Sequence, residues 1–305
     1  MTENKIVRVA NAQGFWGDSL LGPLRLAEEG PVDYLTFDYL AEITMSIMQK
    51  QKMRKPETGY AMDFPPMVKK ILTTCKEKGI KIIANAGGVN PKACLEATKQ
   101  VVKDLGLSGI KIAIVEGDDI MDRLDELAAA GEKLENMDTG ASLDSIRDRI
   151  TSANVYIGAA QIVEALKDGA DIIITGRAAD PSLVVAPLVY EFGWSLEDWD
   201  KVAAATIMGH IMECGAQCTG GNYTGWKQVK DFALPGEQAR KARVPARQKR
   251  ARYDGCTARV TAGNIACAGG HVNGVELSPV LVQPLCHPDV HSHRSILCLL
   301  IPSQC

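Results

Sequence analysis

Residues 80–91 read IKIIANAGGVNP and place a strand, a turn and a helix start within twelve residues. Ile80–Ala84 is a short apolar run of the kind that forms a buried strand. The turn contains Gly87 and Gly88, and it ends in Asn90, a good helix N-cap, and Pro91, a good first helical residue. The segment therefore predicts a strand that passes directly into a helix.

The same unit recurs along the first 230 residues. Residues 170–181, ADIIITGRAADP, repeat it with Asp180 as the cap and Pro181 at the first helical position. Apolar, strand-like runs occupy residues 5–10, 32–37, 80–84, 110–115, 155–160 and 170–174. Amphipathic, helix-like stretches occupy residues 65–77, 91–105, 120–130, 161–168 and 183–192. This alternation predicts an α/β fold with a largely parallel sheet flanked by helices, either doubly wound or barrel-like, joined by right-handed crossovers.

Polar residues follow most of the predicted strands, and in parallel sheets ligands bind beyond the carboxyl ends of the strands. We expect these residues to share one site. A carboxylate or phosphate could rest on the backbone of the glycine turn at the helix start, or on the Arg177 guanidinium. The tight-turn interpretation of the glycines and a structural Arg177–Asp ion pair remain open alternatives. The predicted substrate-binding residues are Asn11, Asn85, Gly87, Gly88, Asn90, Arg177 and Asp180.

Carboxylates that meet in one crevice repel one another, which raises their pKa values or recruits a divalent cation. Asp38 and Glu116 follow two of the predicted strands and are our candidates for general acid–base catalysis. The alternative is that they are helix caps or solvated loop acids.

His210 is the only histidine in the first 230 residues, and it lies in the segment GHIMECGAQC, 209–218. If this segment is helical, Glu213 shares a face with His210. The pair predicts either an acid–base couple or part of a metal site with Cys214, against the alternative of an ordinary surface histidine. The cysteines here are better explained as small buried hydrophobic residues.

Composition excludes several classes of protein. The net charge of -3 provides no positive electrostatic field that would attract nucleic acid or anionic lipid. No apolar run is long enough for a membrane helix. Nine cysteines without a framework spacing favour a reduced, cytoplasmic chain. No dinucleotide fingerprint, P-loop or serine-hydrolase motif is present, so no NAD or ATP site is expected.

Residues 231–305 differ in composition from the rest of the chain. Residues 1–230 carry 25 Lys+Arg and 32 Asp+Glu, a balance of -7, whereas residues 231–305 carry 9 and 5, a balance of +4. The apolar periodicity also stops there. We expect a poorly structured, atypical tail from a shifted reading frame or mis-spliced exon, with a divergent domain or a basic or metal-binding segment as alternatives. The cysteine spacing lacks the paired geometry of a zinc site.

Six motifs occur in order and together resemble the acyclic terpene utilisation family. They are VANAQGFWGD (9–18), DYLTFDYLAEITM (33–45), ANAGGVNP (84–91), GADIIITGRAADPSL (169–183), EFGWSLEDWD (191–200) and GHIMECGAQCTGGNYTGW (209–226). The likeness covers about residues 5–230, after which the family's glycine-rich continuation is replaced by the tail. The resemblance implies a role in the catabolism of branched terpenoid acids through acyl-CoA intermediates.

We therefore expect an enzyme that acts on a small carboxylate or an acyl-CoA by lyase, hydratase or isomerase chemistry. The alternatives are a non-catalytic subunit or scaffold that needs a partner chain, and an inactive truncated product. A homo-oligomer is compatible with both the enzyme hypothesis and the subunit hypothesis.

Overall fold

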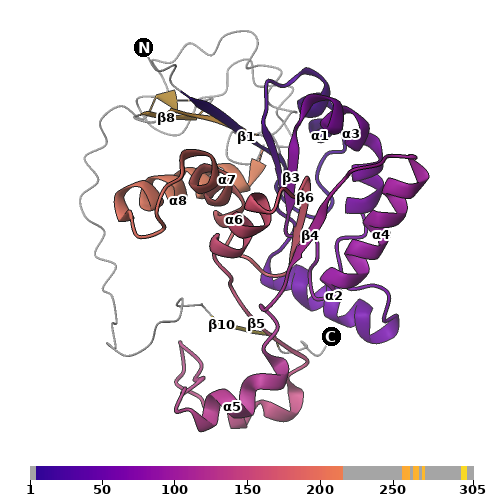
Figure 1. Ribbon diagram of the computed structural model, residues 1–305. Coiled ribbons are helices and arrows are strands. Elements are labelled where there is room, and N and C mark those ends of the chain that lie inside the picture. Colours follow the sequence, from indigo (N-terminus) through magenta and orange to yellow (C-terminus); the bar gives the residue numbers. More distant parts are fainter. Residues whose placement is uncertain (1–4, 216–255, 262–263, 268–269, 272–296, 301–305) are drawn as a thin grey trace, which may run out of the picture.

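The computed structural model describes residues 5–215 together with 256–261, 264–267, 270–271 and 297–300 (Figure 1). Its main sheet has the strand order β4-β6-β3-β2-β1-β7-β8-β9. The first five of these strands are parallel: β1 (Ile6–Gln13), β2 (Tyr34–Phe37), β3 (Lys81–Ala84), β4 (Ile112–Val115) and β6 (Ile172–Thr175). The predicted α/β fold is confirmed, and the open strand order makes it doubly wound, not barrel-like.

Helices cover both faces of the parallel strands (Figure 1). One face carries α1 (Leu21–Glu29), α2 (Glu42–Arg54), α3 (Phe64–Lys78) and α4 (Pro91–Asp104). The opposite face carries α6 (Ala160–Lys167), α7 (Ser182–Phe192) and α8 (Trp199–Glu213). Strand side chains alternate between the two cores: Ile82 and Ile172 point to the first, whereas Ile83 and Ile173 point to the second.

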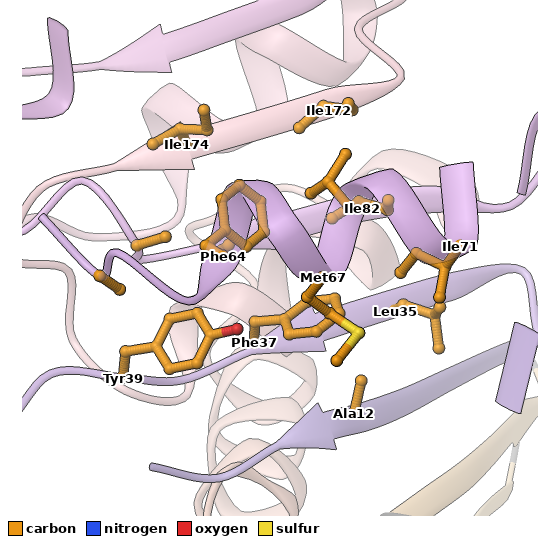
Figure 2. Packing of buried hydrophobic residues seen from close by; sticks show 14 of the residues in the cluster. Ala12, Leu35, Phe37, Tyr39, Phe64, Met67, Ile71, Ile82, Ile172 and Ile174 are labelled. Carbon is orange, nitrogen blue, oxygen red and sulfur yellow. The ribbon is translucent and has the colours of Figure 1, made fainter. Parts of the chain in front are cut away.

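The first core is centred on α3, which lies across the strands in Figure 2. Phe64 and Met67 of this helix are essentially unexposed, and the Phe64 ring meets Phe37 of β2 edge-on at 5.7 Å between centroids. Burial of a side chain of this size contributes about 1.5–3 kcal/mol. Pro65 and Pro66 in the first turn and Gly79 at the C-cap, with φ +69°, fix the two ends of the helix.

The winding direction reverses between β3 and β6, which are neighbours in the sheet. The chain leaves β3 into α4 on one face and leaves β6 into α7 on the other. Loops that part in this way leave a crevice at the carboxyl ends of the strands, where doubly wound proteins bind their ligands. This reversal places the loops 85–90 and 176–181 side by side.

One predicted strand lies elsewhere. Residues 155–160 do not enter the parallel sheet; β5 (Ser152–Val155) precedes them and pairs instead with β10 (Leu297–Leu300). Only an isolated bridge joins Ile157 to Ala178 of the loop after β6. The predicted helix 120–130 is a 3₁₀ turn, η1 (Met121–Arg123), followed by α5 (Leu124–Ala129). With the turns η2 (Leu143–Ser145) and η3 (Arg147–Arg149), α5 and β5 bury a small separate cluster around Leu124 and Ala153.

Most of the tail 231–305 lies outside the described residues. The parts that are described are β7 (Cys256–Thr261), β8 (Asn264–Cys267), β9 (Gly270–His271) and β10, and β7 pairs antiparallel with β1. The origin that we expect for this tail stays a prediction.

Candidate active site

Arg177 stands at the centre of a polar cluster beyond the carboxyl ends of β1, β2 and β6. Its side chain is 3% exposed, and its guanidinium donates to the Leu40 carbonyl at 2.5 Å and to the Tyr156 hydroxyl at 3.0 Å. Nη2 also donates to Glu42 Oε1 at 3.2 Å, and Nη1 lies 3.3 Å from Asp180 Oδ1. The guanidinium carbon lies 4.3 Å from the centre of the Tyr156 ring. This buried cation therefore holds three separate segments together, and its Nε has no hydrogen-bond partner among the residues that the structure describes.

Asp38 and Asn85 lie at the ends of two adjacent strands and form a buried pair. Asn85 Nδ2 donates to Asp38 Oδ1 at 2.6 Å, and Asn85 Oδ1 accepts from the Tyr39 backbone at 2.7 Å. Both side chains are almost completely buried, and Asp38 Oδ2 accepts no hydrogen bond from the described part of the chain. Buried polar atoms normally find a partner, so this oxygen has the capacity to bind a further group.

The C-terminal end of α8 brings a second carboxyl group to the same place. Asn11 of β1 donates from Nδ2 to the backbone oxygen of Glu213 at 2.9 Å, and no described residue donates a hydrogen bond to Asn11 Oδ1. A Cβ at Gly14 would lie 2.3 Å from the Cys214 carbonyl carbon, so only glycine permits this close approach. The Glu213 side chain accepts a hydrogen bond from the Cys214 thiol at 3.0 Å.

Three carboxyl groups of the cluster have raised pKa values. Burial raises the pKa of Asp38 well above its ordinary value, and the nearby charges of Asp180 and Glu213 raise it further. Burial is also the main cause that raises the pKa of Asp180 and of Glu213, although Arg177 and His210 oppose it in both. Raised pKa values of this kind favour the protonated form of a carboxyl group and are typical of groups that donate and accept protons at functional sites.

His210 lies on α8 and is exposed, one turn before Glu213. Its charge lowers the pKa of both Asp180 and Glu213, so it stands close to the cluster without entering the buried network. The segment 209–213 is helical, which is the condition under which Glu213 shares a face with His210, whereas residues 216–226 lie outside the described part of the chain.

The glycine turn after β3 is occupied by the protein's own backbone. Gly87 N donates to the Thr175 carbonyl at 3.0 Å, and Val89 N donates to Gly59 at 3.0 Å. A Cβ at Gly87 would lie 2.6 Å from Thr175 O, and Gly88, at φ +53°, is equally enclosed. Asn90 caps α4 and also donates to the carbonyls of Pro56 and Thr58 in the loop between α2 and α3. This geometry favours the tight-turn interpretation of the two glycines, and the anion cradle expected on them stays a prediction.

A polar cavity of about 180 Å³ opens between the loop after β3 and the loop after β4. Its walls include Lys52, Asn90, Glu116, Asp118 and Asn154. Glu116 is exposed at this cavity, 3.8 Å from Lys92, and it does not join the Arg177 cluster. Asp118 is buried, accepts from the Arg177 backbone at 2.8 Å and from Asn154 at 2.9 Å, and so lies between the cavity and the cluster. The predicted site residues thus divide between two adjoining places.

Within the described ranges, no three His, Cys, Asp or Glu side chains are arranged to hold a metal ion. The divalent cation expected from the sequence has no assigned site in this part of the chain. In the same residues, no helix combines the length and the apolarity that a bilayer crossing requires.

Sequence reasoning missed Tyr156, Asn154 and Lys52. The first two belong to the segment after η3 whose position depends on pairing with β10 and with the loop after β6, so no local pattern indicates them. Lys52 lies on α2, which buries only Met45 and Met48 and therefore has a weak apolar periodicity.

The fold and the cluster define a doubly wound α/β protein with a buried, carboxylate-rich site at the carboxyl ends of its strands. The family model described as "Acyclic terpene utilisation family protein AtuA" matches residues 7–239, so the chain belongs to this family. No curated protein matches significantly, and neither does any solved structure.

Proposed function

We propose that this protein catalyses proton transfer on a branched terpenoid acid or its acyl-CoA thioester, in a lyase, hydratase or isomerase reaction. The observation that carries the proposal is the group of Asp38, Asp180 and Glu213, whose pKa values are all raised by burial. General acid–base catalysis needs a group whose pKa lies near the working pH. The family's link to terpene utilisation supports the substrate class.

In this proposal Asp38 is the acid–base residue. Its free Oδ2 takes a proton from the carbon next to the substrate carbonyl, or from the γ carbon when the substrate is an α,β-unsaturated thioester. It returns the proton to the same carbon or, through the dienolate, to the other end of the allylic system. Asn85 holds Oδ1 at 2.6 Å and orients the carboxyl group, while Glu213 and the nearby His210 relay the proton to solvent. Arg177 stabilises negative charge that develops on the carbonyl oxygen through its unpartnered Nε. Glu116 and the polar cavity bind the more polar end of the substrate.

Isotope exchange tests this chemistry without a prior choice between the three reaction types. The full chain is incubated in D₂O with 3-methylbut-2-enoyl-CoA, and deuterium uptake and hydration are followed by NMR and mass spectrometry. We expect uptake that falls by about 10²–10⁴-fold in Asp38→Asn. The matched control is Asp144→Asn, because Asp144 is an exposed acid away from the cluster.

Unchanged uptake in Asp38→Asn would remove this residue from the mechanism. If the parent chain shows no uptake at all, the non-catalytic subunit becomes the better hypothesis, and the experiment is repeated with its co-purifying partner. We further propose a cytoplasmic location and a small-molecule ligand; the location is supported by Cys75 and Cys94, which are buried and form no disulfide within the described residues.

A further inference from the structure

The polar cavity between the loops after β3 and β4 contains a cation that no acid balances. Lys52 lines the cavity and is half-buried, and its Nζ donates to the Val89 carbonyl at 2.7 Å. Glu116 pairs with Lys92 at 3.8 Å, and among the residues that the structure describes no carboxylate lies within ion-pair distance of Lys52. Lysines are rarely withdrawn from water without a partner. The Lys52 ammonium is therefore available to an anionic ligand.

The helix α4 begins at the same cavity. Its first residue, Pro91, and its cap, Asn90, both line the walls. The N-terminus of a helix carries partial positive charge and backbone N–H groups, which favour an anion. Glu116 and Asp119 also line the cavity, so a singly charged carboxylate is favoured over a doubly charged phosphate. Lys52 and the start of α4 thus define one end of a carboxylate site.

Asn154 provides a second, independent binding group. Its side chain is 2% exposed and lines the cavity. Its Nδ2 donates to Asp118 Oδ2 at 2.9 Å, which fixes the orientation of the amide, and Oδ1 accepts no hydrogen bond from any described residue. Buried carbonyl oxygens normally accept one, so a ligand here should carry a donor. A hydroxyl is favoured over an ammonium group, because a neutral amide oxygen does not offset the desolvation of a buried charge.

Asp118 links the cavity to the Arg177 cluster. This residue lines the cavity, and the Oδ2 atom that accepts from Asn154 also accepts from the Arg177 backbone N–H at 2.8 Å. A group that binds Asn154 is therefore connected through one carboxyl group to the loop that carries Arg177.

We propose that this cavity binds an α-hydroxy carboxylate, with the carboxylate at Lys52 and the start of α4 and the hydroxyl donating to Asn154 Oδ1. The inference rests on the proposed function, which places the more polar end of the substrate here, and it names the chemistry of that end. The volume of about 180 Å³ corresponds to about six water molecules of ~30 Å³ each. Such a space accommodates this head group and requires its two polar groups to be close together.

Three probes with one branched skeleton test the inference on the full chain by titration calorimetry. They are 2-hydroxy-2-methylpropanoate, 2-methylpropanoate, which lacks the hydroxyl, and 2-hydroxy-2-methylpropanamide, which lacks the charge. We expect the hydroxy acid to bind at least tenfold more tightly than either of the others, because each of these loses one of the two interactions.

Two variants separate the two interactions. Lys52→Gln should weaken the hydroxy acid at least tenfold and leave the hydroxy amide within twofold. Asn154→Ala should lower the affinity of the hydroxy acid to that of 2-methylpropanoate, whose own affinity stays within twofold; a loss of folding would weaken both acids alike. The matched control is Lys78→Gln, because Lys78 also donates to a backbone carbonyl, that of Ala27 at 2.8 Å, but lies at the end of α3 outside the cavity.

Equal affinities for the hydroxy acid and 2-methylpropanoate, no binding of the hydroxy acid, or unchanged binding in Lys52→Gln would each overturn the inference. Tighter binding of 2-amino-2-methylpropanoate than of the hydroxy acid would also overturn it, because the donor would then be an ammonium group. The proposed function can fail separately, since binding requires no proton transfer. Absence of deuterium uptake with retained selectivity for the hydroxy acid contradicts only the chemistry, whereas uptake without this selectivity contradicts only the cavity.

Discussion

The backbone N–H of Arg177 donates to Asp118 Oδ2 at 2.8 Å, and this bond fastens the loop after β6 to the loop after β4. Asp118 lies directly over Gly176, where an added Cβ would be 2.1 Å from its Oδ1. The same carboxyl group accepts from Asn154, so the segment after η3 is fixed as well. The position of the guanidinium therefore depends on three loops that are distant in sequence.

Truncation of Arg177 is expected to destabilise the fold strongly. Arg177→Ala removes a buried cation and leaves Asp180 and the Leu40 carbonyl without their partner, at a cost of about 3–5 kcal/mol. Urea unfolding measures this change. Arg123→Ala is the control, because its ion pair with Glu126 is exposed and worth less than about 1 kcal/mol. Similar losses in the two variants would contradict a central role for Arg177.

The pH dependence of stability should reveal the buried Asp38 carboxyl group. Its pKa is raised in the folded state, so the native protein binds more protons than the unfolded chain, and stability falls as the pH rises from the unfolded to the folded pKa. The Asp38→Asn variant has no carboxyl group to titrate at this position, so its stability does not fall with rising pH for this reason. The stability of the variant relative to the parent should therefore increase between pH 5 and pH 8 in urea unfolding. A constant difference across this range would show that the Asp38 pKa is not raised.

A substitution at Gly87 tests whether the turn after β3 is tightly packed. Gly87→Ala would place a Cβ 2.6 Å from the Thr175 carbonyl oxygen, which belongs to the backbone of β6 and cannot move aside easily. We expect a destabilisation of about 1–3 kcal/mol. Thermal unfolding compares it with Gly158→Ala, which should change stability by less than about 0.5 kcal/mol because its Cβ meets open space. Equal melting temperatures would mean that the turn is not tightly packed.

His210 is expected to tune its neighbours from outside the buried network. Its charge lowers the pKa of Asp180 and Glu213, so His210→Gln should raise both values further. Titration of carbon-13-labelled carboxyl groups by NMR measures this directly. Because His210 is exposed, the fold should remain intact, and unchanged carboxyl titration would exclude His210 from the site.

Much of the fold follows from apolar runs and helix starts in the sequence. The runs at 80–84 and 170–174 predict β3 and β6, and Asn90 accepts from Ala93 N as a predicted cap should. The sequence did not reveal α1 or α2. The first carries Gly22 and Pro23 in its opening turn, and the second has a weak apolar periodicity because it buries only two side chains.

The candidate site is predictable only where it lies at strand ends. Asp38, Asn85 and Arg177 follow strands and Asn11 lies near the end of β1, and the parallel sheet brings them together. Glu116 also follows a strand, but β4 is separated from β3 by the inserted β6, so its side chain reaches the polar cavity instead. Tyr156 reaches Arg177 by long-range pairing that leaves no local signal.

The order of strands has a consequence for biosynthesis. The strand β6 lies between β3 and β4 in the sheet but follows both of them in the sequence. β3 and β4 are therefore synthesised before the strand that pairs with both of them. During that interval their facing edges carry unpaired N–H and C=O groups that can recruit other chains. The nascent polypeptide should therefore depend on chaperones until residues 172–175 emerge, and a fragment that stops short of them should aggregate.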